Sequence, residues 1–283
     1  MDAGHPVRAV VVGVDGSRSS LRAVHWAAAE AASRNAPLRI VAACDPGLGG
    51  GPARDHANWA LAEAVHIAGR ARPGLPVQRQ LGVGSAVPVL DTHARAALLV
   101  VVGDRGTGGG AAGRSLGSVP AALGTRVRCP VVVVRGEYLA RDAGRPVVVG
   151  VDSGSSAGDA ALAFAFEAAA ARGVAVVAVR TWWEQLLDTA MDAIEAAERV
   201  CLAERLAGWC ATYPAVPVLP VVQRDLPAHA LTQWSRGAQL VVVGYRGRGW
   251  PTGLVLGSVS HTLMHRAHCP VAIVPRGATG TTR

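Results

Sequence analysis

The stretch VVVGYRGRGWPTGLVLGSVSHTL, residues 241–263, begins as an apolar run that ends in Gly244 and continues into a glycine-rich loop. Gly247 follows, and the pair Gly257-Ser258 precedes a segment of helical composition. Glycine lets the backbone approach a ligand closely and adopt positive φ angles. A loop of this kind at a helix N-terminus presents free N–H groups and positive dipole, which suits phosphate. A tight turn between strand and helix explains a single occurrence equally well.

The pattern occurs twice, because the chain is an internal repeat. Four segments return in the same order: VVGVDGSRSS (11–20), LLVVVGDRG (98–106), LGSV (116–119) and CPVVVV (129–134) as VVGVDSGSSA (148–157), QLVVVGYRG (239–247), LGSV (256–259) and CPVAIV (269–274). A unit of about 140 residues is therefore duplicated, and each copy is long enough to be a domain. We predict domains over 1–140 (copy one) and 141–283 (copy two), with the polar segment 136–145 as linker.

Within each copy, short Val-rich runs alternate with longer Ala-rich stretches. Runs such as LLVVVG are continuously apolar, which is typical of strands buried on both faces. Stretches such as SSLRAVHWAAAEAASR have the composition and length of helices. This alternation predicts an α/β fold of two tandem doubly wound domains, each with a five-stranded parallel sheet and helices on both faces.

Two strand ends in each copy carry candidate binding residues. The first strand ends in Gly-Val-Asp, which gives Asp15 and Asp152, and the fourth ends in Gly103 and Gly244. Ligands of open parallel sheets bind outside the carboxyl ends of the strands, where the strand order reverses. If the first and fourth strands are neighbours, each aspartate faces its glycine loop across one crevice.

The helix that follows each loop completes the predicted site. Ser118 and Ser258 stand in good N-cap positions, and Pro120 suits a first helical turn. A carboxylate across the crevice can accept hydrogen bonds from ribose hydroxyls or from an adenine amine. Because loop and aspartate occur together twice, a nucleotide site is favoured over a simple turn.

Composition excludes several other functions. The formal net charge is +8, and all 28 basic residues are arginines. Without lysine the chain can form neither a Schiff base nor a Walker A motif. The arginines are scattered and aromatic residues are few, so nucleic acid is not an expected partner. The five cysteines form no C-x-x-C pair, and Cys129 and Cys269 are expected to be buried. No apolar run reaches the ~18 residues of a membrane span and no signal peptide is evident, so we expect a cytoplasmic protein without membrane contact.

With these motifs the chain resembles the universal stress protein family over nearly its whole length. ATP-binding members of that family carry G-x2-G-x9-G-[ST] after the fourth strand. Copy two matches this pattern with Gly244, Gly247, Gly257 and Ser258. Copy one has Gly103, Gly106, Gly117 and Ser118, but ten residues instead of nine separate its second and third glycines. The additional residue falls in the stretch Gly108–Gly110, so copy two is expected to bind more tightly.

The resemblance implies a sheet order of 3-2-1-4-5 and binding of an adenine nucleotide, ATP with or without Mg²⁺. It implies a role in stress responses and pairing through the last strands. We therefore expect segments 130–135 and 270–274 to pair as an intramolecular pseudo-dimer, to which a homodimer could be added. In the family a backbone group at the end of the second strand contacts the adenine edge. That implies Ala42 and Ala43 in copy one, and Ala178 and Val179 in copy two.

Three functions stay open: a regulatory nucleotide-binding protein, a slow ATPase or phosphotransferase using the same sites, and a dimeric scaffold that binds no nucleotide. The sequence shows no Ser-His-Asp or Cys-His signature and no carboxylate pair for a metal. Binding is therefore favoured over catalysis, and no catalytic or metal-ligating residue is predicted.

Three further groups of residues have two explanations each. His261 and His265 could share a helix face as metal ligands, although an ordinary helix is the simpler interpretation. Trp182 and Trp183 could flank an adenine, but anchoring a loop on the core is favoured. Arginines in the glycine loops could contact phosphate or could be solvated: Arg105, Arg246 and Arg248.

Overall fold

The computed structural model describes residues 8–45, 47, 50–106, 116–136, 144–152, 154–183, 191–245 and 256–277. The chain divides into two compact units, Met1–Arg135 (unit 1) and Gly136–Arg283 (unit 2). Several predicted features lie outside the described residues: much of the linker, the Gly108–Gly110 stretch, and Arg246, Gly247 and Arg248.

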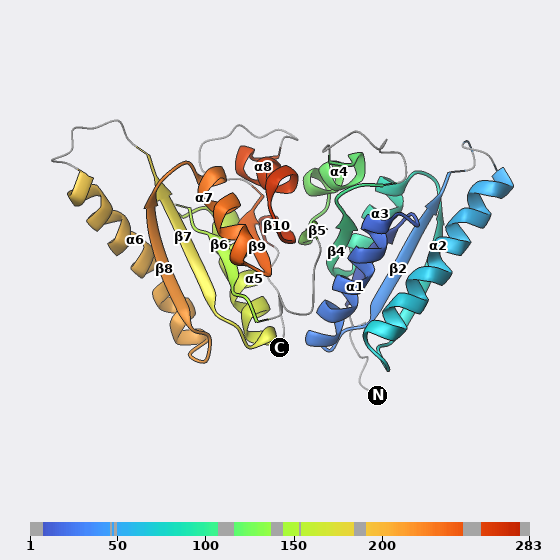
Figure 1. Ribbon diagram of the computed structural model, residues 1–283, viewed down its shortest axis with the longest axis horizontal. Coiled ribbons are helices and arrows are strands. Elements are labelled where there is room, and N and C mark those ends of the chain that lie inside the picture. Colours follow the sequence, from blue (N-terminus) through green and yellow to red (C-terminus); the bar gives the residue numbers. More distant parts are fainter. Residues whose placement is uncertain are drawn as a thin grey trace. The chain divides into compact units, whose positions relative to one another are not determined.

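Strands and helices alternate through the described part of unit 1 (Figure 1). The elements are β1 (Ala9–Val14), α1 (Arg18–Ser33), β2 (Leu38–Cys44), α2 (Gly50–Ala71), β3 (Val77–Val83), α3 (Ala86–Ala94), β4 (Ala97–Gly103), α4 (Ser118–Arg126) and β5 (Val131–Val134). The strands pair in parallel in the order β3-β2-β1-β4-β5. This is the predicted order 3-2-1-4-5.

The described part of unit 2 repeats the arrangement. Its elements are β6 (Val147–Gly150), α5 (Ser156–Arg172), β7 (Val176–Trp182), α6 (Met191–Thr212), β8 (Val218–Arg224), α7 (Pro227–Trp234), the short 3₁₀ helix η4 (Ser235–Gly237), β9 (Leu240–Gly244), α8 (Ser258–Arg266) and β10 (Val271–Val274). Its strands pair in parallel in the order β8-β7-β6-β9-β10. Each unit is therefore a doubly wound sheet of the predicted kind.

Helices cover both faces of each sheet, as predicted. In unit 1, α1 and α2 pack against each other and on one face, while α3 and α4 pack together on the other. In unit 2, α5 and α6 form one such pair, and α7 and α8 form the other. The central strands β1 and β4 are accordingly buried on both sides, with Val10, Val11 and Val12 and Leu99, Val100 and Val101 at 0% exposure. The edge strands β3 and β8 are largely exposed, which accounts for the polar run VQRQL and for Pro220 there.

The buried cysteines follow the prediction. Cys129 and Cys269 are both buried, each beside the last strand of its unit. Burial raises the pKa of the Cys129 thiol to about 12, so this thiol stays protonated and unreactive at neutral pH. It is a packing residue.

The backbone conformation of two glycines in unit 2 predicts opposite effects of an alanine substitution on stability. Gly173 ends α5 in the left-handed region, at φ 63°, whereas Gly208 lies within α6, and a Cβ on either would meet nothing within 4 Å. Gly173→Ala should lower the free energy of unfolding by about 1 kcal/mol, because only glycine adopts that φ without strain. Gly208→Ala should raise it by about 0.5–1 kcal/mol, because alanine favours the helix.

Chemical denaturation of both variants checks the pair. The substitution is the same, the environment is open in both cases, and both residues belong to one unit. Equal shifts in the same direction would contradict this assignment of backbone conformation.

Candidate functional site

The crevice of unit 1 lies where β1 and β4 end side by side. The two strands pair in parallel, so the neighbourhood assumed for the first and fourth strands is present, and β6 and β9 repeat it in unit 2. Asp15 follows directly after β1, and Gly103 is the last residue of β4. The carboxylate and the start of the glycine loop therefore meet at one sheet edge.

Asp15 contacts the glycine loop directly. A Cβ atom built on Gly106 would lie 2.7 Å from Asp15 Oδ2, so a side chain at position 106 would press on the carboxylate. The other oxygen, Oδ1, accepts a hydrogen bond of 3.0 Å from the Ser17 N–H. One carboxylate oxygen thus orders the turn into α1, and the other lies against the loop.

A buried carboxylate, Asp104, organises basic residues beside the same loop. Asp104 is 3% exposed and accepts a 2.5 Å hydrogen bond from the Ser19 hydroxyl. Arg22 Nη2 and Arg105 Nε lie 3.6 and 3.4 Å from its carboxylate oxygens. Burial lowers the pKa of the nearby Arg135, and Asp104 opposes that shift. Three arginines surround one aspartate, so the loop entrance keeps an excess of positive charge.

Helix α2 adds an imidazole and an indole to the other side of the turn. His56 Nε2 lies 2.9 Å from the carbonyl oxygen of Asp15, and the His56 and Trp59 rings are 5.5 Å apart. A Cβ on Gly16, whose φ is 79°, would lie 2.5 Å from the Trp59 ring. Trp59 is nevertheless 52% exposed, so one part of the indole covers the turn and the rest faces solvent. Sequence reasoning missed both side chains, because α2 approaches the turn only in the folded unit.

The strand-end glycines have a packing reason of their own. A Cβ on Gly103 would lie 2.7 and 2.8 Å from the carbonyl carbon and oxygen of Ser19 in α1. A Cβ on Gly244 would lie 2.9 Å from the Ala157 carbonyl oxygen in α5. Each glycine is thus required by a helix that crosses the strand end closely, whatever the loop binds.

The helices after the loops begin one residue earlier than predicted. Gly117 and Gly257 have extended backbone angles and are the N-caps, whereas Ser118 and Ser258 are the first helical residues. The prediction of serine N-caps is therefore wrong by one position, because glycine adopts the cap conformation without a side-chain cap bond. Gly117 N–H donates to the Asp104 carbonyl and Gly257 N–H to that of Tyr245, so each loop closes on its strand end. Pro120 lies in the first turn of α4, as predicted.

The aspartate of unit 2 has a different environment. Asp152 Oδ1 accepts hydrogen bonds of 3.1 Å from the N–H groups of Gly154 and Ser155, and Oδ2 accepts one from the Ser155 hydroxyl. A Cβ on Gly158 would clash with the same carboxylate. The Asp152 side chain therefore caps the start of α5, its own neighbouring helix.

The strand register shows that the residues implied for adenine contact in copy one are not equivalent to those implied in copy two. Val14 of β1 pairs with Ala42, and Gly150 of β6 pairs with Val179. Because Gly13 and Gly150 are equivalent in the repeat, Val179 corresponds to Val41, and Arg180 corresponds to Ala42. Ala42 and Ala43 are at the carboxyl end of β2, whereas Ala178 and Val179 lie mid-strand in β7. The sequence-based choice in copy two is thus two positions too early.

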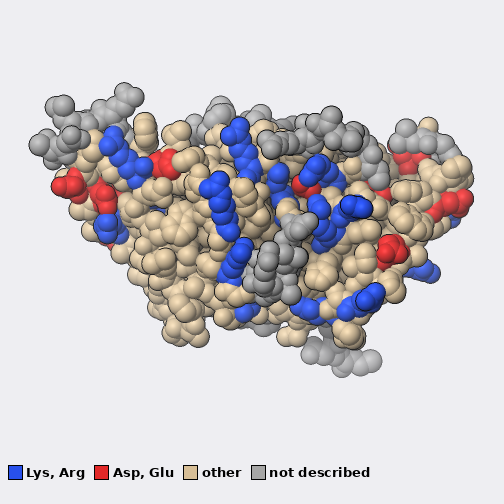
Figure 2. Space-filling model, viewed as in Figure 1, with Lys and Arg blue, Asp and Glu red and all other residues tan. Residues whose placement is uncertain are grey.

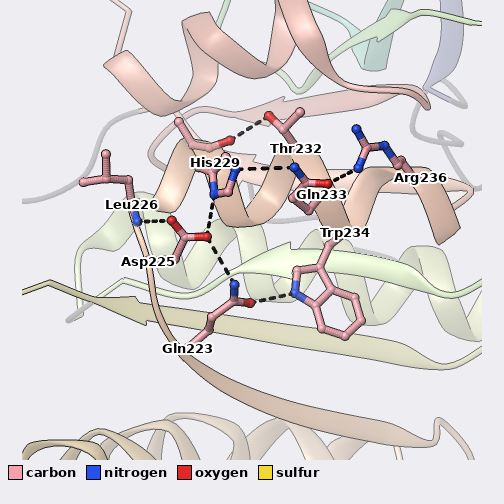
Figure 3. A network of polar contacts seen from close by, with 9 residues as sticks. Gln223, Asp225, Leu226, His229, Thr232, Gln233, Trp234 and Arg236 are labelled. Carbon is pink, nitrogen blue, oxygen red and sulfur yellow. Dashed lines mark hydrogen bonds and ion pairs between the residues drawn. The ribbon is translucent and has the colours of Figure 1, made fainter. Parts of the chain in front are cut away.

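A second polar cluster occurs in unit 2 at the end of β8 (Figure 3). Asp225 Oδ2 contacts His229 Nδ1 at 2.7 Å and accepts a hydrogen bond of 3.2 Å from Gln223 Nε2. The Trp234 indole N–H donates to Gln223 Oε1 at 3.3 Å, and Asp225 Oδ1 caps the N–H of Leu226. The cluster orients an exposed imidazole at the start of α7, and these described contacts include no nucleophilic side chain. We assign it to ordering that end of the helix.

The other candidate groups gain little from the structure. The His261 and His265 rings are 4.6 Å apart on α8, as the spacing predicts. Within the described ranges, no group of three or more His, Cys, Asp or Glu residues could hold a metal ion. Trp182 is buried and Trp183 is 55% exposed, and the Arg224 guanidinium lies 5.8 Å from each ring. Trp182 is thus the core anchor of that pair.

Two further observations concern the charged side chains on one face and the length of the described helices. On the face drawn in Figure 2, arginine side chains (blue) form separate groups with acidic side chains (red) near some of them. None of the described helices is long and apolar enough to cross a membrane.

Comparison with known proteins gives consistent matches along the chain. The family model described as "Universal stress protein family" matches residues 6–135 and again residues 144–275. Universal stress protein Rv2005c of Mycobacterium tuberculosis is 39% identical over 284 residues, which cover 93% of this chain and 96% of that protein. Universal stress protein Rv2623 of the same organism is 39% identical over 302 residues, covering 99% of this chain and 100% of that protein.

One solved structure has the same fold over nearly the whole chain, and another is similar in sequence to half of it. The crystal structure of a universal stress protein from Archaeoglobus fulgidus has a TM-score of 0.72 at 18% identity, covering 96% of this chain and 100% of that one. A universal stress protein solved in complex with cAMP is 35% identical, covers 46% of this chain and 99% of its own, and has a TM-score of 0.39.

Proposed function

The chain belongs to the universal stress protein family, and from this premise we propose that it is a regulatory protein of stress responses that binds an adenine nucleotide, ATP in the first instance. The observation that carries the proposal is the contact between Asp15 and Gly106 in unit 1. It joins the carboxylate that follows β1 to the glycine loop that follows β4.

The chemistry of this crevice fits a nucleotide part by part. Asp15 supplies acceptor oxygens for ribose hydroxyls or an adenine amine. Gly106 and Gly117 keep the loop backbone free of side chains that would cover phosphate oxygens, and the first turn of α4 supplies N–H groups beside them. Arg22 and Arg105 add positive charge at the loop entrance. Trp59, half exposed beside Gly16, offers an aromatic face at the edge of the site.

These residues support binding and retention more than cleavage. Phosphoryl transfer requires a positioned water or acceptor besides phosphate ligands, usually with Mg²⁺. Asp104 already accepts from Ser19 and lies between arginines, so it is not placed as a general base. A Mg²⁺ ion would arrive with the nucleotide, and we assign no protein ligand to it. A slow ATPase or phosphotransferase and a nucleotide-free scaffold remain the alternatives to be tested.

Location and assembly are part of the same proposal. We infer a cytoplasmic protein, because adenine nucleotides are available there. The proposed pseudo-dimer pairs segments 130–135 and 270–274, whose β5 and β10 are fully buried valine-rich strands at the ends of their sheet orders. An isolated segment 1–140 that stays monomeric and fully stable at high concentration would contradict it.

The nucleotide assignment is tested on the whole chain. Protein purified without added nucleotide is denatured, and released small molecules are identified by mass. Protein stripped of nucleotide is then titrated calorimetrically with ATP, AMP and cAMP. We expect ATP to be released and rebound. ADP that accumulates with time in the ATP complex would favour the enzyme. If no nucleotide is released and none of the three gives binding heat, the scaffold that binds no nucleotide is the remaining function.

A further inference from the structure

The two units differ at one position beside the crevice. The pairing of β1 with β2 ends at Val14 and Ala42. The residue of unit 2 that is equivalent to Ala42 is Arg180. A methyl group in unit 1 is thus replaced by the longest cationic side chain in unit 2. The Val151 N–H bonds to the Val179 carbonyl at 2.9 Å, so the pairing of β6 and β7 continues up to this residue.

Arg180 is held at the sheet edge of unit 2 by two contacts. Its Nη1 donates a hydrogen bond of 3.0 Å to the Asp152 carbonyl oxygen, and its Nε is paired with Glu198 of α6. The residue is only 6% exposed. In unit 1 the equivalent carbonyl, that of Asp15, is met instead by the exposed imidazole of His56. Displacing Arg180 would leave the Glu198 carboxylate, whose side chain is 24% exposed, and the Asp152 carbonyl without this partner, which is costly.

Other residues beside the site also differ between unit 1 and unit 2. The Asp152 carboxylate accepts the N–H groups of Gly154 and Ser155 and the Ser155 hydroxyl, whereas Asp15 accepts the N–H of Ser17. Ser17 and Ser155 are the two equivalent N-caps, so Ala160 of unit 2 stands where unit 1 has Arg22. Tyr245 likewise replaces Asp104 after the strand-end glycine. The arrangement of acid and arginines around Asp104 is therefore specific to unit 1.

We propose that Arg180 is a built-in occupant that closes the nucleotide crevice of unit 2, so that the chain binds one adenine nucleotide, in unit 1. This inference rests on the proposed function. It reverses the expectation from glycine spacing, by which copy two would bind more tightly. Spacing describes the phosphate loop, whereas Arg180 and Asp152 occupy the sheet edge that the rest of the nucleotide needs.

Binding stoichiometry tests the proposal. Calorimetric titration of the nucleotide-free chain with ATP should give one site, and Asp15→Ala should remove it. Arg180→Ala, which restores the residue type of unit 1, should add a second site. The double variant Arg180→Ala with Glu198→Ala should add it too, because both members of the ion pair are then absent. Arg205→Ala is the control: it removes the 2.6 Å ion pair with Asp159 in the same unit and should leave one site.

The outcomes separate this inference from the proposed function. Three results would overturn the role of Arg180 and leave nucleotide binding itself standing. They are two sites in the parent chain, one site that survives Asp15→Ala, or one site in both Arg180 variants with folding retained. No site in the parent chain would overturn both. Circular dichroism of each variant shows whether folding is retained.

Discussion

Gly103→Ala should destabilise unit 1 by about 3 kcal/mol, a larger loss than other glycine-to-alanine changes in the strands of that unit. The added methyl group would lie 2.5–2.8 Å from the hydroxyl and main-chain carbonyl of Ser19. Main-chain atoms cannot rotate away, so α1 has to move off the sheet. That movement also disturbs the Ser19–Asp104 hydrogen bond. Thermal unfolding should show a midpoint lower by about 10 °C.

Gly13→Ala is the matched control for this prediction. Gly13 lies in β1 of the same unit, and its Cβ would approach mainly the terminal methyl groups of Leu90, the nearest at 2.9 Å. Side-chain ends can change rotamer, so the loss should stay below about 1.5 kcal/mol. Equal losses for the two variants, or a Gly103→Ala protein as stable as the parent, would show that α1 does not hold its place against β4.

The strand order shows which structural features the sequence could predict. Continuous valine runs, helical spacers and the repeat together specify a doubly wound parallel sheet, and the pairing confirms it in both units. The crevice between the first and fourth strands follows from that order. Asp15 and Gly106 could therefore be placed together without coordinates, although they are far apart in sequence.

The differences between the two crevices could not be predicted in the same way. Asp15 and Asp152 stand in nearly identical sequences, but one additional residue before the N-cap Ser155 adds the Gly154 N–H and the Ser155 hydroxyl to the hydrogen bonds of Asp152. Arg180 was not among the predicted residues because the sequence placed the end of the second strand of copy two two residues too early, and only the pairing register corrects it. Gly103 and Gly244 looked like phosphate ligands alone, because the close approach of α1 and α5 is a tertiary contact.

Asp15→Asn should weaken ATP binding by about 10- to 100-fold while leaving the fold intact. The asparagine keeps an oxygen that can accept from the Ser17 N–H, so the turn into α1 is retained. What is lost is the charge of the oxygen beside Gly106. One or two charge-assisted hydrogen bonds are worth about 1.5–3 kcal/mol each, and 1.4 kcal/mol corresponds to a tenfold change in affinity. Calorimetric titration with ATP measures the loss, and thermal unfolding should place the midpoint within about 2 °C of the parent.

Asp152→Asn provides the comparison within the same chain. Asparagine keeps one acceptor oxygen for the N–H groups of Gly154 and Ser155 but loses the second oxygen, which accepts the Ser155 hydroxyl, so the substitution should lower the stability of unit 2 and leave the affinity for ATP unchanged. The two variants thus exchange their effects: one loses ligand and keeps stability, and the other loses stability and keeps ligand. An affinity loss in Asp152→Asn as large as that in Asp15→Asn would mean that both aspartates contact nucleotide. Unchanged affinity in Asp15→Asn would remove the crevice between β1 and β4 from consideration as the binding site.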